Sequence, residues 1–325
     1  MGFWLSWFRS QFTKLPYPQK SFAGKTIIVT GSNVGLGLEA ARHLVRLDAA
    51  KVILAVRTSS KGEQAKAAIE ASVGRKGVVE VWPLDLESYD SVKAFASRAE
   101  SLPRLDIVIE NAGVFAFDWK MAEEDELTIT VNAVSTLLLA FLLLPKLRET
   151  SVKFNQDAVL TFTGSFVHYL TEFPERAEKD IFEGLKNKET ARMDDRYNVA
   201  KMIEMLLVQE LASQISSSAK PKVIVNNANP GFVATTVMRG ASGFFKAILT
   251  LVVSLFARTA EVGSRTSVHA AEGGVETHGS YLNDCKPGQV SDWVRSEDGK
   301  ATQKKLWGEL LKKLEGIAPG VTSNL

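Results

Sequence analysis

The stretch Lys25-Thr-Ile-Ile-Val-Thr-Gly-Ser-Asn-Val-Gly-Leu-Gly37 decides the fold. It is a short β-branched run that ends in three glycines, and the amphipathic pattern Glu39-Ala-Ala-Arg-His-Leu-Val-Arg-Leu47 follows it. This order predicts a strand, a tight turn and a helix, the setting in which a glycine-rich loop binds phosphate. Gly31 can adopt backbone angles closed to other residues, Gly35 would let a diphosphate approach, and Gly37 would let helix and strand pack closely. We therefore predict a dinucleotide site at the first helical turn, with a plain strand-to-helix turn as the alternative.

Strand and helix patterns alternate from residue 25 onward, which predicts an α/β fold, a single-domain doubly wound parallel sheet with helices on both faces. The strand patterns are nearly continuous apolar runs, as expected when both faces are covered, and about seven are present. They fall near 25–31, 51–56, 78–83, 105–110, 157–163, 221–228 and 279–283. Helix patterns fall near 35–47, 60–73, 88–101, 123–149, 196–215, 259–272 and 302–314.

The composition suits one large domain, because the chain has 325 residues, of which 45% are apolar. The formal net charge is +2, so nothing indicates a basic surface for nucleic acid. The one cysteine, Cys285, and four histidines without ligand spacing give neither a disulfide framework nor a metal site. These features fit a reducing, cytoplasmic location. We assign residues 22–325 to the domain and 1–21 to an N-terminal arm.

The N-terminal arm, residues 1–21, is rich in aromatic side chains, among them Trp7, Phe8 and Phe12. It is too short and too charged to span a bilayer, and it lacks the apolar core and cleavage site of a signal peptide. Two interpretations remain. The arm forms an interfacial helix that makes a peripheral membrane contact, or it packs on its own domain or on a partner.

Two stretches interrupt the alternating pattern. Residues 166–195 form an insert that is mostly polar and charged. Residues 237–257 are strongly apolar, but Lys246 breaks the run and leaves it below spanning length. We interpret this second stretch either as a buried helix or as a lid over a lipophilic substrate.

A tyrosine and a lysine stand one helical turn apart in Tyr197-Asn-Val-Ala-Lys201. The spacing places the phenol and the ammonium on one face of a predicted helix. A free tyrosine titrates near 10, too high for ready proton exchange at neutral pH, and a neighbouring ammonium lowers that value. On its own this pattern is common and usually describes a solvated pair.

Three further features favour the catalytic interpretation of that pair. Thr161-Phe-Thr-Gly-Ser165 and Asn111-Ala-Gly113 each follow a predicted strand, and ligands of such sheets sit at the carboxyl ends of strands. Asn132 lies within a long apolar helix pattern, where a buried amide needs hydrogen-bonding partners. A satisfied core amide is the alternative for Asn132.

With these residues in view, the chain resembles the short-chain dehydrogenase/reductase family over roughly residues 22–283, which implies a Rossmann fold. The matching motifs, in family order, are Thr30-Gly-Ser-Asn-Val-Gly-Leu-Gly37, Leu84-Asp85-Leu86, Asn111-Ala-Gly113, Asn132, Ser165, Tyr197 with Lys201, and Asn229-Pro-Gly231 with Thr235. Glu110 replaces a more usual Asn, and Gly164 stands where a second Ser is common. The longer insert after Ser165 is similar to that of the branch that includes retinol dehydrogenases and fungal relatives.

The resemblance implies a role for each catalytic residue. Tyr197 would exchange the alcohol proton. Lys201 would lower the pKa of Tyr197 and bind the nicotinamide ribose. Ser165 would hydrogen-bond the substrate carbonyl, and Asn132 would orient a water. The cofactor-binding residues given by the loop and the resemblance are Gly31, Ser32, Asn33, Val34, Gly35, Leu36, Gly37, Arg57, Lys61, Asp85, Asn111, Ala112, Gly113, Tyr197, Lys201, Pro230, Gly231, Val233 and Thr235.

The charge at the end of the second strand predicts which cofactor binds. An NAD enzyme commonly places a carboxylate there, but Ile53 to Ser60 contains no Asp or Glu. Arg57 lies in this stretch and Lys61 follows it. Because a guanidinium suits the 2′-phosphate, we predict NADP(H).

The leading hypothesis is an NADP(H)-dependent oxidoreductase that interconverts a carbonyl and an alcohol on a lipophilic small molecule. We expect it to work in the reductive direction. A role in secondary metabolism is a further hypothesis. The alternative is a non-catalytic NADP(H)-binding sensor or scaffold. An epimerase or dehydratase of the extended relatives is a third candidate, but these carry a G-x-x-G-x-x-G spacing that this chain lacks. The helices predicted at 123–149 and 196–215 commonly form the dimer face in this family, so we also expect a homodimer.

Overall fold

The computed structural model describes residues 3–234 and 256–325. Its core is an eight-stranded sheet in the order β10-β9-β8-β7-β4-β1-β2-β3. The strands of this sheet are β1 (Thr26–Thr30), β2 (Lys51–Val56), β3 (Val79–Pro83), β4 (Ile107–Glu110), β7 (Ala158–Thr163), β8 (Val223–Asn229), β9 (Tyr281–Asn283) and β10 (Lys286–Pro287). The first seven in chain order pair in parallel, as expected, and β10 adds a short antiparallel edge.

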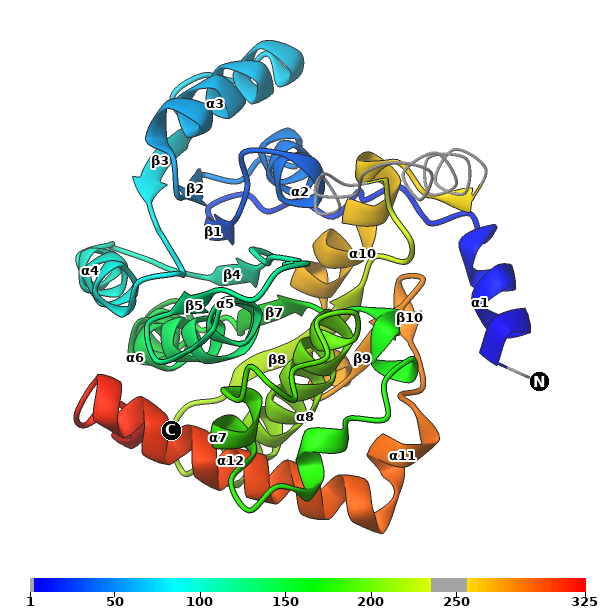
Figure 1. Ribbon diagram of the computed structural model, residues 1–325. Coiled ribbons are helices and arrows are strands. Elements are labelled where there is room, and N and C mark those ends of the chain that lie inside the picture. The colour runs from blue at the N-terminus through cyan, green and yellow to red at the C-terminus, as the bar shows by residue number, and fades with distance from the viewer. Residues whose placement is uncertain (1–2, 235–255) are drawn as a thin grey trace.

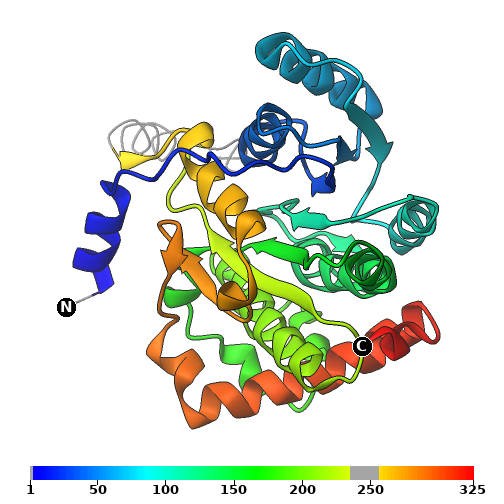
Figure 2. The same ribbon diagram turned by 180° about the vertical axis from the view of Figure 1, so that it is seen from behind.

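Helices cover both faces of the sheet, which confirms the predicted doubly wound architecture (Figure 1). The longer helices are α2 (Gly35–Arg46), α3 (Ser59–Val73), α4 (Tyr89–Glu100), α6 (Thr136–Phe154), α8 (Arg196–Ser217), α10 (Ala260–Glu272) and α12 (Glu297–Ile317). Alternate residues of each strand enter two separate cores: Ile27 packs with α2, α3 and α10, and Ile28 packs with α4, α6 and α8. Figure 2, the view from behind, shows α10 lying across the sheet on the first of these faces.

The predicted helix at 123–149 begins later and is not uniform. Residues 121–126 instead form a small hairpin of β5 (Met121–Ala122) and β6 (Asp125–Glu126). The helix begins with α5 (Leu127–Ile129), because the Glu126 side chain caps it by accepting the N–H of Thr128. It then passes through a π-helical turn, η1 (Thr130–Ser135), into α6. The stretch Leu127–Phe154 is long and apolar enough to cross a membrane, but most of its apolar part is buried here, as in a core helix.

The C-terminal helix, α12, is longer than the predicted 302–314. Ser296 caps it by accepting the N–H of Gly299, and Glu297 and Asp298 occupy the first turn. Acidic residues are favourable at this end of a helix dipole. Leu306, Leu310 and Leu314 are fully buried, and α12 runs along the outside of α8 (Figure 1).

This placement of α12 bears on the expected homodimer. α12 contacts α8, and the C-terminal turn η6 (Val321–Asn324) contacts α6, so the same chain covers parts of the predicted dimer helices. The homodimer therefore stays a prediction. Sedimentation velocity tests it, because a species of one 35.6 kDa chain at micromolar concentration would remove it.

The N-terminal arm forms α1 (Phe3–Gln11), which lies against its own domain. The Gln11 amide donates to the Phe232 carbonyl over 2.6 Å and accepts the Phe232 N–H over 3.1 Å. Ser10 Oγ donates to Asp284 Oδ1 over 2.8 Å. Packing on its own domain is thus the interpretation that the contacts favour, and the membrane contact stays a prediction.

The structure describes the first of the two interrupting stretches in full and only the end of the second. The insert 166–195 folds as η2 (Phe166–Tyr169), η3 (Pro174–Ala177) and α7 (Ile181–Leu185), and Glu309 of α12 accepts the Ile181 N–H over 2.9 Å. The predicted lid, 237–257, lies outside the described residues except for its last two.

Candidate active site

The glycine-rich loop packs so closely that two of its glycines admit no side chain. At Gly31, where φ is +64°, a Cβ would lie 2.8 Å from the Ala112 Cα. At Gly37 a Cβ would lie 2.5 Å from the Asn111 Nδ2. Gly35, where φ is +60°, faces open space. These environments are what the phosphate-binding interpretation requires, with two tight contacts and one open approach.

The first turn of α2 adds hydrogen-bond donors to this loop. Val34 occupies the N-cap position, and no side chain caps the N–H groups that follow it. A helix N-terminus with such N–H groups favours an anion. The Ser32 hydroxyl does not join them, because it is buried and donates to the Val29 carbonyl over 2.8 Å.

A cavity of 380 Å³ opens at the carboxyl ends of β1, β2 and β4. Many predicted cofactor residues line it, namely Gly31, Asn33, Val34, Gly35, Leu36, Arg57, Asp85, Asn111, Ala112 and Gly113. Lys61 does not line it, since this residue is exposed in the first turn of α3. The cavity is also lined by residues that sequence reasoning missed, namely Ala55, Leu84, Leu86, Glu87, Val114, Phe115 and Val131. Leu84 and Leu86 flank Asp85, so the motif around Asp85 could have indicated them.

Arg57, the predicted ligand of the 2′-phosphate, already has an anionic partner. Its guanidinium pairs with Glu87, and Lys120 Nζ lies 2.7 Å from the other oxygen of that carboxylate. Although partial burial opposes ionisation, Lys120 and Arg57 hold the pKa of Glu87 below its usual range. Glu87 itself sits in the turn after β3, where its N–H donates to Asp85 Oδ1 over 3.0 Å. A 2′-phosphate would therefore compete with Glu87 for Arg57.

The turn after β4 is held by side chains of the neighbouring strand and helix. Thr30 Oγ1 accepts the N–H groups of Asn111 and Ala112, each over 2.9 Å, and Asn111 Nδ2 donates to the Thr30 carbonyl over 2.9 Å. The Asn132 amide donates to the Val114 carbonyl over 2.8 Å and accepts the Val114 N–H over 2.9 Å. Asn132 thus anchors this turn with its side chain, which is the alternative that we left open for it.

Asn132 also lies in the π-helical turn η1, which the sequence did not indicate. Such turns occur as single insertions in α-helices, frequently at functional sites. The inserted geometry lets a buried helix place an amide against the loop that lines the cofactor cavity.

Tyr197 and Lys201 lie in the first turns of α8, as predicted. Lys201 is buried; its Nζ donates to the Thr163 carbonyl over 2.8 Å and lies 2.6 Å from Glu204 Oε2. The Tyr197 ring packs against Phe115, which lines the cofactor cavity, with 4.9 Å between ring centroids. Tyr197 therefore contacts the lining of the cofactor cavity through Phe115, and Lys201 contacts the end of β7 through the Thr163 carbonyl.

The pKa of Tyr197 is shifted upward, whereas a neighbouring lysine alone was expected to lower it. Burial raises the pKa of Tyr197 above its usual value, Lys201 opposes that rise, and Glu204 adds to it. Lys201 acts on the Tyr197 pKa in the predicted direction, but burial and Glu204 outweigh it, so the net shift is upward. Although burial alone would lower it, Glu204 raises the pKa of Lys201, so the ammonium stays charged.

Ser165 follows β7 directly and caps η2. Its Oγ accepts the Val167 N–H over 3.3 Å, so its own hydrogen remains available to donate to a carbonyl. Its backbone carbonyl lies 2.7 Å from Nδ1 of His168, a buried residue. Burial lowers the pKa of His168 to about 4, so the ring is neutral and Nδ1–H is the donor. Ser165 directly precedes η2, and η2 packs against α8, the helix that carries Tyr197.

The absence of a second serine before Ser165 has a steric cause. A Cβ at Gly164 would lie 1.8 Å from Asn227 Oδ1. The Asn227 amide occupies that space and donates to Glu204 Oε1 over 3.4 Å. Gly164 and Asn227 therefore complement each other beneath the Lys201–Glu204 pair.

The turn after β8 faces the glycine-rich loop. Gly231 has φ of +81° and its N–H donates to Asn229 Oδ1 over 3.1 Å, while the Pro230 carbonyl accepts from Arg258. Val233 pairs with Arg258 as a parallel bridge, and its side chain lies with that of Leu36 against Gly263. This contact brings Pro230, Gly231 and Val233 toward the glycine-rich loop, and Thr235 lies outside the described residues.

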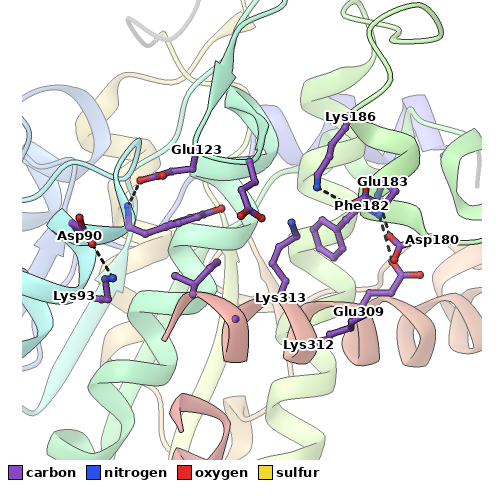
Figure 3. A pocket seen from close by; sticks show the side chains of 14 residues that line it. Asp90, Lys93, Glu123, Asp180, Phe182, Glu183, Lys186, Glu309, Lys312 and Lys313 are labelled. Carbon is purple, nitrogen blue, oxygen red and sulfur yellow. Dashed lines mark hydrogen bonds and ion pairs between the residues drawn. The ribbon is translucent and has the colours of Figure 1, made fainter. Parts of the chain in front are cut away.

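A separate hollow of 470 Å³ lies between α4, α7 and α12 (Figure 3). Its charges are largely paired, with Lys93 Nζ 2.8 Å from Asp90 and Lys186 Nζ 2.6 Å from Glu183. None of the predicted catalytic residues lines it. We therefore interpret this hollow as a solvated seam between helices. Among residues 3–234 and 256–325, no group of three or more His, Cys, Asp or Glu side chains could hold a metal ion.

Comparisons with known proteins agree with this geometry. The family described as short chain dehydrogenase matches residues 25–154. The short chain dehydrogenase/reductase dmxR8 of Cryptosporiopsis sp. is 46% identical over the full length of both chains. The short chain dehydrogenase atnD of Emericella nidulans is 48% identical, covering 85% of this chain and 89% of its own. A short chain dehydrogenase structure from Pseudomonas syringae superposes with a TM-score of 0.62 at 23% identity, covering 84% of this chain and 99% of its own.

A parallel sheet with a glycine-rich loop beside a Tyr–Lys pair is the arrangement expected of a nucleotide-binding oxidoreductase. The chain belongs to the short-chain dehydrogenase/reductase family, and its similar relatives are fungal.

Proposed function

We propose that this protein is an NADP(H)-dependent reductase that converts a carbonyl group of a lipophilic small molecule to an alcohol. The observation that carries the proposal is the placement of Tyr197, buried Lys201 and Ser165 around the end of β7, beside a cavity lined by the glycine-rich loop. A tailoring step in secondary metabolism would suit such a fungal enzyme.

The cavity fits a dinucleotide in its chemistry. The glycine-rich loop and the α2 N-terminus would hold the diphosphate, Asp85 would lie at the adenine end, and Arg57 would bind the 2′-phosphate. Pro230, Gly231 and Val233 would border the nicotinamide. Related folds have been solved with either cofactor: the Pseudomonas aeruginosa RhlG complex holds NADP, and a Brucella melitensis reductase holds NADH. We choose NADP(H) because Arg57, a cation, lines the cavity where the second strand ends.

The residues of the chain supply the proton and orient the substrate. When bound, NADPH supplies the hydride for the carbonyl carbon. Ser165 donates its hydroxyl hydrogen to the carbonyl oxygen and so stabilises the negative charge that develops there. Tyr197 transfers its proton to that oxygen, the Lys201 ammonium acts on the phenol through its charge, and Lys201 would bind the ribose. Tyr197 is protonated at neutral pH, as the reductive direction requires, and the Lys201 ammonium opposes the rise that burial causes in the pKa of this phenol.

A non-catalytic NADP(H)-binding module is the alternative, and it is weakened by the presence of Ser165, Tyr197, Lys201 and Asn132 together. Purified protein mixed with NADPH and a panel of lipophilic ketones and aldehydes separates the two. A reductase consumes NADPH with at least one substrate. NADPH binding without turnover of any carbonyl would favour the binding module.

We also propose that the protein is cytoplasmic and touches a membrane through the exposed aromatic side chains of α1 and the residue after it. Phe8 and Phe12 are 46% and 60% exposed, and their rings cluster with Phe256. Exposed aromatic side chains suit the headgroup level of a bilayer. Flotation with phosphatidylcholine vesicles tests this contact. The wild-type protein should float and a Phe8→Ser/Phe12→Ser variant should not, whereas wild-type protein that stays at the bottom would remove the proposal.

A further inference from the structure

A second cavity, of 430 Å³, lies beside the proposed catalytic residues and shares no lining residue with the cofactor cavity. Phe166 lines it and directly follows Ser165. Gly231 also lines it and belongs to the turn that would border the nicotinamide. The cavity thus adjoins Ser165 through Phe166 and the turn that would border the nicotinamide through Gly231. Its size falls within the usual range of small-molecule sites, roughly 300–1,000 Å³.

The N-terminal helix forms one wall of this cavity through Trp7, Ser10 and Gln11. α1 is fixed at this place by backbone and charged groups. Gln11 bonds both the N–H and the carbonyl of Phe232, the residue after Gly231. Ser10 bonds Asp284, whose carboxylate also forms a buried ion pair with Arg258 over 2.6 Å. The arm is therefore tied to the same turn that would border the nicotinamide.

Four aromatic side chains line this cavity, namely Trp7, Phe166, Tyr169 and Tyr281. The Trp7 ring centroid lies 5.8 Å from that of Phe166 and 6.3 Å from that of Phe232. On another side, Tyr169 and Tyr281 both line the cavity and pack on His168, at 4.3 and 5.2 Å between centroids. Rings arranged around a cavity favour a flat ring in it, because offset and edge-to-face aromatic contacts are attractive.

Polar groups lie between these rings and the end of β8. Asn229 and Asn283 line the cavity and hold each other through one hydrogen bond, 2.7 Å from Nδ2 to Oδ1. The lining therefore mixes rings with amide, hydroxyl and carboxylate groups, and such polar groups fix the orientation of a ligand. This combination suits a ring system that carries hydroxyl or carbonyl substituents.

We propose that α1 is the outer wall of the substrate site and that Trp7 and Phe166 hold an aromatic ring of the substrate, whose carbonyl lies at Ser165 and Tyr197. The proposal rests on the reductase function and names its substrate class, an aromatic ring-bearing ketone or aldehyde. On this proposal, the N-terminal arm packs against the active site of its own chain through Trp7. Phe8 lies on the exposed side of the same helix.

The test compares Trp7→Ala with Phe8→Ala, a matched aromatic truncation on the same helix that does not line the cavity. Two substrates are used, the two-ring ketone 2-acetylnaphthalene and the small diketone butane-2,3-dione. Trp7→Ala should raise KM for 2-acetylnaphthalene about tenfold, as expected for one lost aromatic contact, with kcat nearly unchanged. KM for butane-2,3-dione and Kd for NADPH should stay within about twofold. Trp7→Phe should retain most of the affinity, and Phe8→Ala should behave as wild type.

Calorimetry of 2-acetylnaphthalene binding to the NADP-bound protein keeps this inference separate from the reductase function. The reductase function is decided by NADPH consumption across the panel of carbonyls, and even without reduction of these two ketones, weaker binding to Trp7→Ala than to Phe8→Ala would support the aromatic site. Equal effects of the two variants on KM or on binding, or equal effects of Trp7→Ala on both ketones, would overturn it.

Discussion

Lys201 Nζ and Glu204 Oε2 are 2.6 Å apart, and both side chains are buried on α8, about one and two turns after Tyr197. The carboxylate partly neutralises the ammonium that would otherwise act on the phenol alone. Burial and the neighbouring Glu204 carboxylate both raise the pKa of Glu110, a fully buried carboxyl at the end of β4. The acidity of Tyr197 is therefore set by the pair and not by the lysine alone.

Replacing Glu204 should shift the pH dependence of catalysis. The charged groups that face Tyr197 are Lys201 and Glu204, and the carboxylate raises the phenol pKa. In Glu204→Gln this contribution is lost, so the pKa falls. Reduction needs the protonated phenol, and the high-pH limb of kcat/KM should move to lower pH by about one unit. The control is Glu210→Gln, on the same helix but bonded to Gln214 and Gln303. An unmoved limb in Glu204→Gln would contradict this account.

Glu110 should make folding stability depend on pH. Burial raises the pKa of Glu110 to about 8, while in the unfolded chain it titrates near 4.5. The folded state then binds the proton more tightly, so this stability is present below pH 4.5 and is lost as the pH rises through about 8. Glu110→Gln keeps a partner for Thr30 and removes the ionisation. Urea unfolding should show the variant gaining relative to wild type between pH 5 and pH 8, by up to roughly 4 kcal/mol. A pH-independent difference would exclude this role.

Arg57 and Glu87 should control cofactor choice in opposite senses. Arg57→Ala removes a charge-assisted bond to the 2′-phosphate, and kcat/KM with NADPH should fall about tenfold or more while that with NADH changes little. Glu87→Gln releases Arg57 from its ion pair and should tighten NADPH binding. Fluorescence titration and steady-state rates with both cofactors measure these effects. A wild-type preference for NADH would contradict the assignment of NADP(H).

The glycine-rich loop should tolerate no methyl group at Gly37. In Gly37→Ala the Cβ would meet Asn111 Nδ2 at 2.5 Å and the Gly31 carbonyl at 2.8 Å, so the loop must move and NADPH affinity should fall at least tenfold. Gly308→Ala is the matched control, because nothing lies within 4 Å of its Cβ position in α12. Equal NADPH affinity in the two variants would show that the loop does not hold the cofactor.

Much of the fold follows from local sequence signals. Apolar strand patterns and the glycine spacing predicted the parallel sheet, and the Tyr197–Lys201 spacing predicted their place at the start of one helix. These features depend on residues close together in the chain. Glu204 escaped notice because a Lys–Glu pair three residues apart is usually solvated. Here the helix lies between the sheet and α12, so the pair is buried.

Other features depend on contacts between distant segments. The pairing of Arg57 with Glu87 joins the ends of two strands, and Gln11 reaches Phe232 across more than two hundred residues of chain. The π-helical turn at Asn132 leaves no periodic signal in an apolar run where every side chain is buried. Such contacts arise from tertiary packing, which local patterns do not encode.

The most direct test of the central claim follows the hydride from NADPH into the alcohol product and asks whether that product forms without the Tyr197 hydroxyl. Wild-type protein is incubated with NADPH deuterated at the transferred C4 position and an aromatic ketone, and the alcohol is analysed by mass spectrometry. We predict an alcohol that carries one deuterium, and we predict that Tyr197→Phe binds NADPH but forms this product at least a hundredfold more slowly, in line with the contribution of general acid catalysis. A Tyr197→Phe variant as active as wild type, or no labelled alcohol from any ketone, would contradict the account.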